Sequence, residues 1–264
     1  MDARPLAGLI GAEVRGLDLT RLDDSTVGAL RQAILDHQIV ALPDQHIDDT
    51  HHRELTEALG GVRPPVEYLP TNADNGHPDI AVLDSDGGIR ADIWHTDVSW
   101  SATPPALSIL RSLISPEAGG DTMWASQYAA YDALSASMQG FLDGLTAYHT
   151  GQNLPLEGGT IQGGRDAFNA VHPVIRTHPE TGRRALYVNE TFTRRINELE
   201  PAESDVLLRF LFAHGARMEY TCRWSWTPGD VVIWDNRCVQ HYGVYDYSEH
   251  RLMHRTEVVG DVPR

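Results

Sequence analysis

The stretch PGDVVIWDNRCVQHYGVYDYSEHRLMHRTEVVGD, residues 228–261, holds two of the clearest strand patterns in the chain. The runs DVVIWDN (230–236) and RLMHRTEVV (251–259) are rich in β-branched and aromatic residues, as strands usually are. Comparable runs occur upstream, many of them ending at turn residues: DIAVLD (79–84), ALSILRSL (106–113), RALYVNE (184–190) and EYTCRWSW (219–226). From residue 79 onward the chain is therefore expected to consist mainly of short strands.

Helical patterns are fewer. Four segments space their apolar residues as helices do, and the first has Asp24 or Ser25 as a candidate N-cap: 23–37, 48–61, 126–145 and 201–215. The run IVALP (39–43) between the first two reads as a short buried strand. Strands and helices do not alternate regularly, which argues against a Rossmann-like fold or a TIM barrel. The pattern predicts a mainly β protein of the α+β class, a jelly roll flanked by helices.

The bulk composition limits the function. A chain of 264 residues with 41% hydrophobic residues can form one large domain, and we expect residues 1–264 to do so. The net charge of −16 argues against nucleic acids and anionic membranes as partners. No apolar run has the length of a signal peptide or a membrane span, so we expect a cytoplasmic protein. Cys222 and Cys238 are expected to be reduced and buried.

The heptapeptide WHTDVSW (94–100) carries the strongest chemical signal. If it is extended, His95 and Asp97 point to the same side, because side chains alternate along a strand. Two histidines and one carboxylate on one face of a metal are typical of non-haem Fe(II) oxygenases, so a second histidine should come from elsewhere. The triplet HPD (77–79) has the same spacing, but its proline favours a turn before the next strand.

Most of the 13 histidines are expected at the surface or in turns, among them His51, His52 and His178. The C-terminal arginines are different. On an extended strand Arg251, Met253 and Arg255 share a face, and two arginines pointing into one cavity are costly unless anions fill it. Two exposed surface arginines are the alternative interpretation.

Several motifs together resemble the taurine dioxygenase family, and they occur in the family's order: WHTDVSW, GGDTMWAS (119–126), HPVIRTHPETGRRALYVNE (172–190) and WDNRCVQHYGVYDY (234–247). The resemblance runs from about Gly8 almost to the end of the chain. It implies a double-stranded β-helix, the cupin-like jelly roll of the Fe(II)- and 2-oxoglutarate-dependent oxygenases. It also implies that His95, Asp97 and His241 bind the iron, which uses 2-oxoglutarate and O₂ as cosubstrates.

The same resemblance assigns two anion sites. Arg251, assisted by the hydroxyl of Thr122, would bind the far carboxylate of 2-oxoglutarate, for which the planar arginine fork is well suited. Arg255 would bind the anionic group of the substrate, and Phe192 would form an aromatic wall of that pocket.

The chain departs from the family pattern where the amine of taurine would lie. The segment GGVRPPVEYLP (60–70) has no histidine, although Tyr68 could shift into place, and Ala91 occupies the position of an asparagine. We therefore expect a less polar anion than taurine: an alkyl sulfonate, an alkyl sulfate ester or an aryloxyalkanoate. Hydroxylation next to a sulfonate or sulfate group would collapse to an aldehyde and release the anion.

Two other functions remain open at this point. The same three ligands could hold zinc in a hydrolase, or the jelly roll could be a binding protein without catalysis. The paired arginines favour the oxygenase, and intact candidates for all three ligands argue against a non-catalytic protein. The glycine-rich segment 150–166 is expected to be a loop, either an active-site lid or a surface insertion. Homo-oligomerisation is left open.

Overall fold

The computed structural model describes residues 2–87, 90–152, 155–156, 159–160 and 168–264. Its large sheet has the strand order β1-β2-β3-β17-β7-β19-β6-β5, and β4 pairs with β19 beside this path. All pairs in it are antiparallel except β2 with β3. The strands are β1 (Asp2–Pro5), β2 (Ala12–Arg15), β3 (Ile39–Leu42), β4 (Val62–Arg63), β5 (Thr71–Asn72), β6 (His77–Asp84), β7 (Leu107–Ile114), β17 (Val231–Asp235) and β19 (Leu252–Val258).

A smaller sheet, β16-β8-β18, lies against the inner face of the large one: β16 (Thr221–Trp224), β8 (Thr122–Ser126) and β18 (Val239–Gly243). Side chains of β17 point alternately into two apolar clusters, one on each face of the large sheet. Val232 and Trp234 join Trp124 of the small sheet in one apolar cluster, whereas Val231 and Ile233 face the opposite way. Two sheets packed over a shared core are the jelly roll that the sequence predicted.

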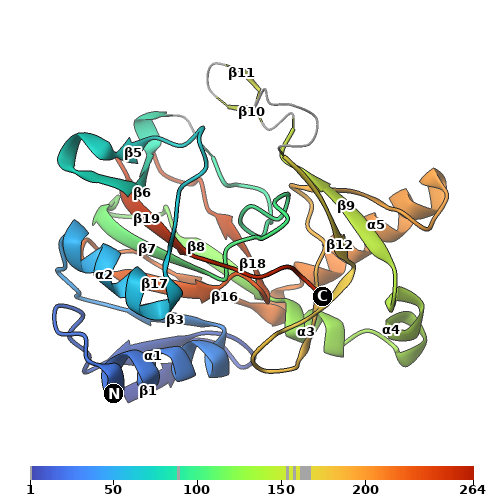
Figure 1. Cartoon of the computed structure of the whole chain (residues 1–264), viewed down its shortest axis with the longest axis horizontal. Coiled ribbons are helices and arrows are strands. Elements are labelled where there is room, and N and C mark those ends of the chain that lie inside the picture. The colour runs from blue at the N-terminus through green and yellow to red at the C-terminus, as the bar shows by residue number, and fades with distance from the viewer. Residues whose placement is uncertain (1, 88–89, 153–154, 157–158, 161–167) are drawn as a thin grey trace.

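Helices cover the outer face of the large sheet. Leu30 of α1 (Asp24–His37) and Leu55 of α2 (Asp49–Gly60) belong to the apolar cluster that contains Val231 and Ile233. The N-cap of α1 is Asp23, whose side chain accepts from the Thr26 backbone N–H, so the cap lies one residue before Asp24 and two before Ser25, the predicted candidates. Figure 1 shows α1 and α2 beside the large sheet and α3–α5 at the other end of the molecule.

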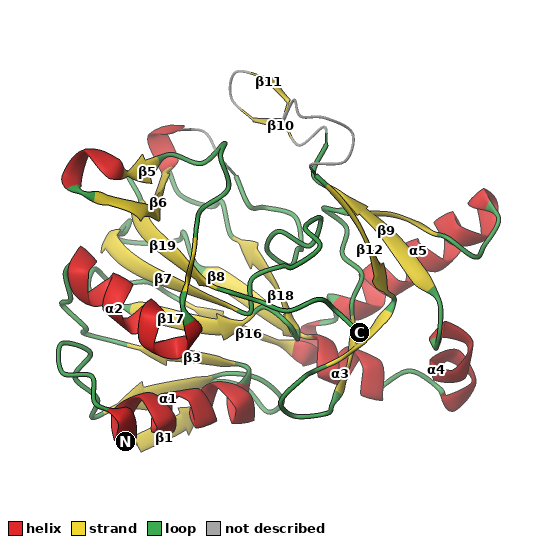
Figure 2. Cartoon of the chain, viewed as in Figure 1, coloured by secondary structure: helices red, strands yellow, loops and turns green. Residues whose placement is uncertain are grey.

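That other end is a separate layer of helices and short strands (Figure 2). Its members are α3 (Gln127–Asp132), α4 (Ala136–Leu142), α5 (Pro201–Gly215), the sheet β12-β9-β15 of β9 (Thr146–Thr150), β12 (Asn169–Pro173) and β15 (Thr193–Ile196), and the hairpin of β13 (Ile175–Thr177) with β14 (Arg184–Leu186). The α5 bounds match the prediction. The single helix predicted for 126–145 is wrong, because α3 ends at Asp132 and Ser135 caps a second helix, α4.

Other boundaries also differ. The run 184–190 forms a strand only to Leu186, and the run 219–226 forms one only from Thr221, after the 3₁₀ turn Met218–Tyr220. The HPD triplet is the start of β6 and not a turn. Short 3₁₀ turns also occur at Ala73–Asn75 and Ser85–Gly87.

The segment predicted as a loop or lid, 150–166, falls largely outside the described residues. Within it, β10 (Pro155–Leu156) pairs with β11 (Gly159–Thr160). Among the described helices, none is both long enough and apolar enough to cross a membrane.

Candidate active site

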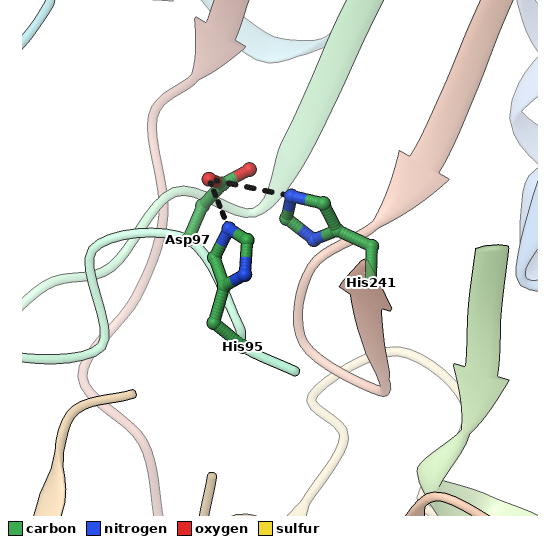
Figure 3. Close-up of side chains that lie close together, drawn as sticks. All are labelled: His95, Asp97 and His241. Atoms are coloured by element: carbon green, nitrogen blue, oxygen red, sulfur yellow. Dashed lines mark ion pairs between the residues drawn. The ribbon is translucent and has the colours of Figure 1, made fainter. Parts of the chain in front are cut away.

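Three side chains from two distant parts of the chain converge beside the small sheet (Figure 3). His95 lies in the connection before β7, and its backbone pairs with that of His241 on β18 through hydrogen bonds of 3.1 and 2.8 Å. Asp97 Oδ1 is 3.9 Å from His95 Nε2 and 3.8 Å from His241 Nε2. All three side chains are buried, and their candidate ligand atoms lie within 4.8 Å of one another.

His95 and Asp97 point to the same place, as predicted, but the stretch around them is not a strand throughout. Residues 94–100 are not an extended strand, because a turn begins at Asp97 and Val98 has a positive φ of 52°. The side chain of Asn236 holds this turn from the far side of the core. Its Oδ1 accepts from the Asp97 N–H at 2.8 Å, and its Nδ2 donates to the Asp97 carbonyl at 3.0 Å. These two hydrogen bonds fix the backbone from which the carboxylate points toward the histidines.

The histidines are prepared to act as ligands. Nδ1 of His95 lies 2.8 Å from the Ile93 carbonyl and therefore carries the proton, which leaves the lone pair on Nε2. Burial lowers the pKa of His95 and lowers the pKa of His241 to about 3, so both rings are neutral. Burial has the largest single effect and would raise the pKa of Asp97, but Arg255, the two histidines and the Ser108 hydrogen bond together lower it and keep the carboxylate ionised.

This donor set fits a divalent metal. Two neutral imidazole nitrogens and one carboxylate oxygen form the facial arrangement found with non-haem Fe(II). Ser108 of β7 donates its hydroxyl to Asp97 Oδ2 at 2.8 Å, which orients the carboxylate and leaves Oδ1 turned toward the histidines. Sequence reasoning missed both Ser108 and Asn236. The only sequence signal for Ser108 was its position within the predicted strand 106–113.

Arg255 lies at the site, but it is already paired. Its Nη1 donates to Asp97 Oδ1 at 2.8 Å, and its Nη2 lies 3.3 Å from Glu257 Oε1. Glu257 in turn accepts from Arg63 Nη1 at 2.8 Å. Neither Arg63 nor Glu257 was predicted, although Glu257 follows Arg255 by two positions on the same strand face. The role of Arg255 in binding substrate stays a prediction.

Arg251 and Thr122 occupy different elements. Arg251 precedes β19, where the pairing with β7 shifts register, and its Nε donates to the Gly120 carbonyl at 3.1 Å. In the β8–β18 pair, Gly243 is opposite Thr122 and His241 is opposite Trp124, so Thr122 faces the same side as His241. Its hydroxyl accepts from the Trp226 indole at 2.9 Å. Their roles toward 2-oxoglutarate stay predictions.

Phe192 and Tyr68 belong to one apolar region beside the candidate metal ligands. The Phe192 ring meets the His95 ring edge-on, with 6.2 Å between centroids. Phe192 belongs to a buried cluster with Trp100, against which Tyr68 packs. Burial raises the pKa of Tyr68 to about 12, so its hydroxyl is neutral near pH 7.

The other histidines and the cysteines were predicted with mixed success. His52 and His178 are buried and not at the surface: His52 Nε2 lies 3.0 Å from Thr256 Oγ1, and His178 Nε2 lies 3.0 Å from Asp235 Oδ2. The HPD triplet takes no part in the ligand cluster. Both cysteines are free and buried, as predicted.

Comparison with known proteins agrees with this geometry. The family model described as "Taurine catabolism dioxygenase TauD, TfdA family" matches residues 2–256. An alpha-ketoglutarate-dependent sulfate ester dioxygenase of Pseudomonas putida is 37% identical, over 100% of this chain and 91% of that protein. An alkylsulfatase of Acinetobacter baylyi is 38% identical, over 99% of this chain and 86% of that protein.

The crystal structure of a taurine dioxygenase from Burkholderia xenovorans has a TM-score of 0.88 and 36% identity, covering 99% of this chain and 90% of that one. These findings confirm the predicted fold and do not support the hydrolase and binding-protein alternatives. The chain belongs to the TauD, TfdA family of taurine catabolism dioxygenases and is an alpha-ketoglutarate (2-oxoglutarate)-dependent dioxygenase.

Proposed function

We propose that this enzyme uses Fe(II) to hydroxylate the carbon that bears the sulfate group of an alkyl sulfate ester. The unstable product R–CH(OH)–OSO₃⁻ then breaks its C–O bond to sulfate and gives an aldehyde and hydrogen sulfate. The names of two relatives, a sulfate ester dioxygenase and an alkylsulfatase, support this substrate class. The family match over residues 2–256 supports a single catalytic domain.

In this proposal His95, Asp97 and His241 hold the iron. Iron with 2-oxoglutarate supplies the oxidising chemistry, which consumes O₂ and yields succinate and CO₂. The protein's part is to fix the ligands: the Ile93 carbonyl selects the tautomer of His95, and Ser108 orients Asp97. Arg251 and Thr122 would hold the far carboxylate of 2-oxoglutarate.

One observation supports an anionic substrate with an apolar chain. Arg255 is buried next to the metal ligands, and its Nε has no hydrogen-bond partner among the described residues. An unpartnered buried donor is costly, and an anionic oxygen would satisfy it. Phe192 and its apolar cluster lie on the same side and would exclude water around the alkyl chain.

The test is substrate-dependent succinate formation with alkyl sulfates, alkyl sulfonates, aryloxyalkanoates and the corresponding neutral alcohols. We expect the alkyl sulfates to give the highest kcat/KM. If a sulfonate or an aryloxyalkanoate is the best substrate, that class is the substrate of the enzyme in place of the sulfate esters. A neutral alcohol as the best substrate would refute the anion-binding role of Arg255.

A further inference from the structure

Arg255 belongs to a buried group of charged side chains, most of which have no role in binding the metal or 2-oxoglutarate. We call Arg63, Tyr68, Arg255 and Glu257 the pocket cluster. Arg63 of β4 lies directly opposite Glu257 in the β4–β19 pair, so both side chains point to the face that carries Arg255. The side chain of Glu257 is 4% exposed and that of Arg63 is 18% exposed.

Glu257 is present as a carboxylate. Its Oε2 accepts from Arg63 Nη1 at 2.8 Å, and its Oε1 lies 3.3 Å from Arg255 Nη2. A protonated carboxyl would need an acceptor for its proton, and a guanidinium offers only donors. Burial and the nearby Asp97 carboxylate raise the pKa of Glu257, and the two arginines limit this rise.

The charges of the described residues near the pocket can therefore be counted. Among these residues, Asp97 is the charged group outside the cluster that acts most strongly on Tyr68, Arg255 and Glu257. In the loaded enzyme a divalent metal, Asp97, the doubly charged 2-oxoglutarate and Arg251 sum to zero. The pocket cluster keeps two guanidinium groups, one carboxylate and a neutral phenol, which leaves one positive charge for the substrate.

We propose that Glu257 and Arg63 set the net charge of the substrate pocket so that it selects a singly charged head group over a doubly charged one. This inference rests on the proposed function, because it takes Arg255 as the group that binds the substrate anion. A sulfate monoester brings one negative charge and neutralises the pocket. A phosphate monoester of the same shape brings two, and the second is left unpaired in a buried site.

Glu257 is thus a specificity-determining residue. Without it Arg255 and Arg63 would together attract a dianion. With it, one arginine charge is already neutralised inside the protein. Removing Glu257 should shift the preference toward the phosphate, and removing Arg63 should shift it away by a similar factor.

Hexyl sulfate and hexyl phosphate test the net charge of the pocket. They share the alkyl chain and the tetrahedral head group but differ in charge above about pH 7. Dissociation constants are measured at pH 8 by calorimetry, without oxygen, on the enzyme loaded with Fe(II) and 2-oxoglutarate. The quantity compared is the phosphate-to-sulfate ratio of the two constants. We expect Glu257→Gln to lower this ratio by about tenfold or more and Arg63→Gln to raise it, the factor corresponding to a single like-charge contact. The double variant restores the net charge and should return the ratio to near the wild-type value.

Glu219→Gln is the matched control, because it removes one acidic group from an exposed site and should leave the ratio unchanged. Melting temperatures establish that each variant folds. If Glu257→Gln does not fold, Arg63→Gln alone tests the inference, through the expected rise of the ratio. A ratio within twofold of wild type in a folded Glu257→Gln or Arg63→Gln protein overturns the inference while leaving the proposed function standing. If the wild-type enzyme binds neither compound, the proposed function fails together with it.

Discussion

Replacing Ser108 by alanine should weaken metal binding, although Ser108 is not itself a candidate metal ligand. The Ser108 hydroxyl donates to Asp97 Oδ2 at 2.8 Å in a fully buried position. The alanine variant leaves that oxygen without this donor, so only the Arg255 contact at Oδ1 still orients the carboxylate. Loss of such an orienting bond typically costs about 10–100-fold in metal affinity, or roughly 1.4–2.8 kcal/mol.

The assay is anaerobic titration of the metal-free protein with Fe(II), read by calorimetry. Ser112→Ala is a matched control, since Ser112 lies four positions further along the same strand, is also buried, and bonds to Ser115 Oγ at 2.6 Å instead. It should keep the wild-type affinity. If Ser108→Ala binds Fe(II) within about twofold of wild type, or if Ser112→Ala loses as much, the orienting role is wrong.

Four further results are expected. Alanine at any one of the three candidate metal ligands should abolish 2-oxoglutarate turnover and greatly weaken Fe(II) binding, and unchanged iron stoichiometry would contradict the site. Arg251→Lys keeps the charge but loses the fork, so 2-oxoglutarate affinity measured by titration should fall by about 1.5–3 kcal/mol; an unchanged dissociation constant would count against the role. Arg255→Ala should raise the KM for the alkyl sulfate far more than that for 2-oxoglutarate, leaving uncoupled succinate formation largely intact. Burial lowers the pKa of His52 to about 3 from 6.5, so stability should fall as the pH drops through that interval. The free energy of unfolding, measured with urea at several pH values, should depend less steeply on pH in His52→Gln, by up to about 1.4 kcal/mol per pH unit. An unchanged pH dependence would refute this.

Local signals in the sequence predicted those parts of the fold that depend on local interactions. The helix α5 has a proline in its first turn and a capping box made by Glu200 and Glu203, and its predicted bounds match the structure. Ser135 was also a local signal, since it caps α4, but the apolar spacing continued across it and a single long helix was predicted. The short strands β8 and β18 have too few residues to show a clear pattern and were not predicted.

The site was predictable in its residue types and not in its geometry. The spacing of His95 and Asp97 pointed to a metal site, and the resemblance to the family added His241. The turn that directs Asp97 depends on Asn236, which is 139 positions away, and no periodicity could show it. In the same way the partners of Arg255 come together only when β4 pairs with β19, which places Arg63 opposite Glu257.

In the proposed function, His95, Asp97 and His241 support oxidative cleavage of an alkyl sulfate. The most direct measurement is the amount of inorganic sulfate and of succinate formed from hexyl sulfate and 2-oxoglutarate, with and without O₂. Fully coupled turnover predicts one succinate for each sulfate in air, and neither product without oxygen. Release of sulfate without O₂, or without an equivalent of succinate, would contradict the account.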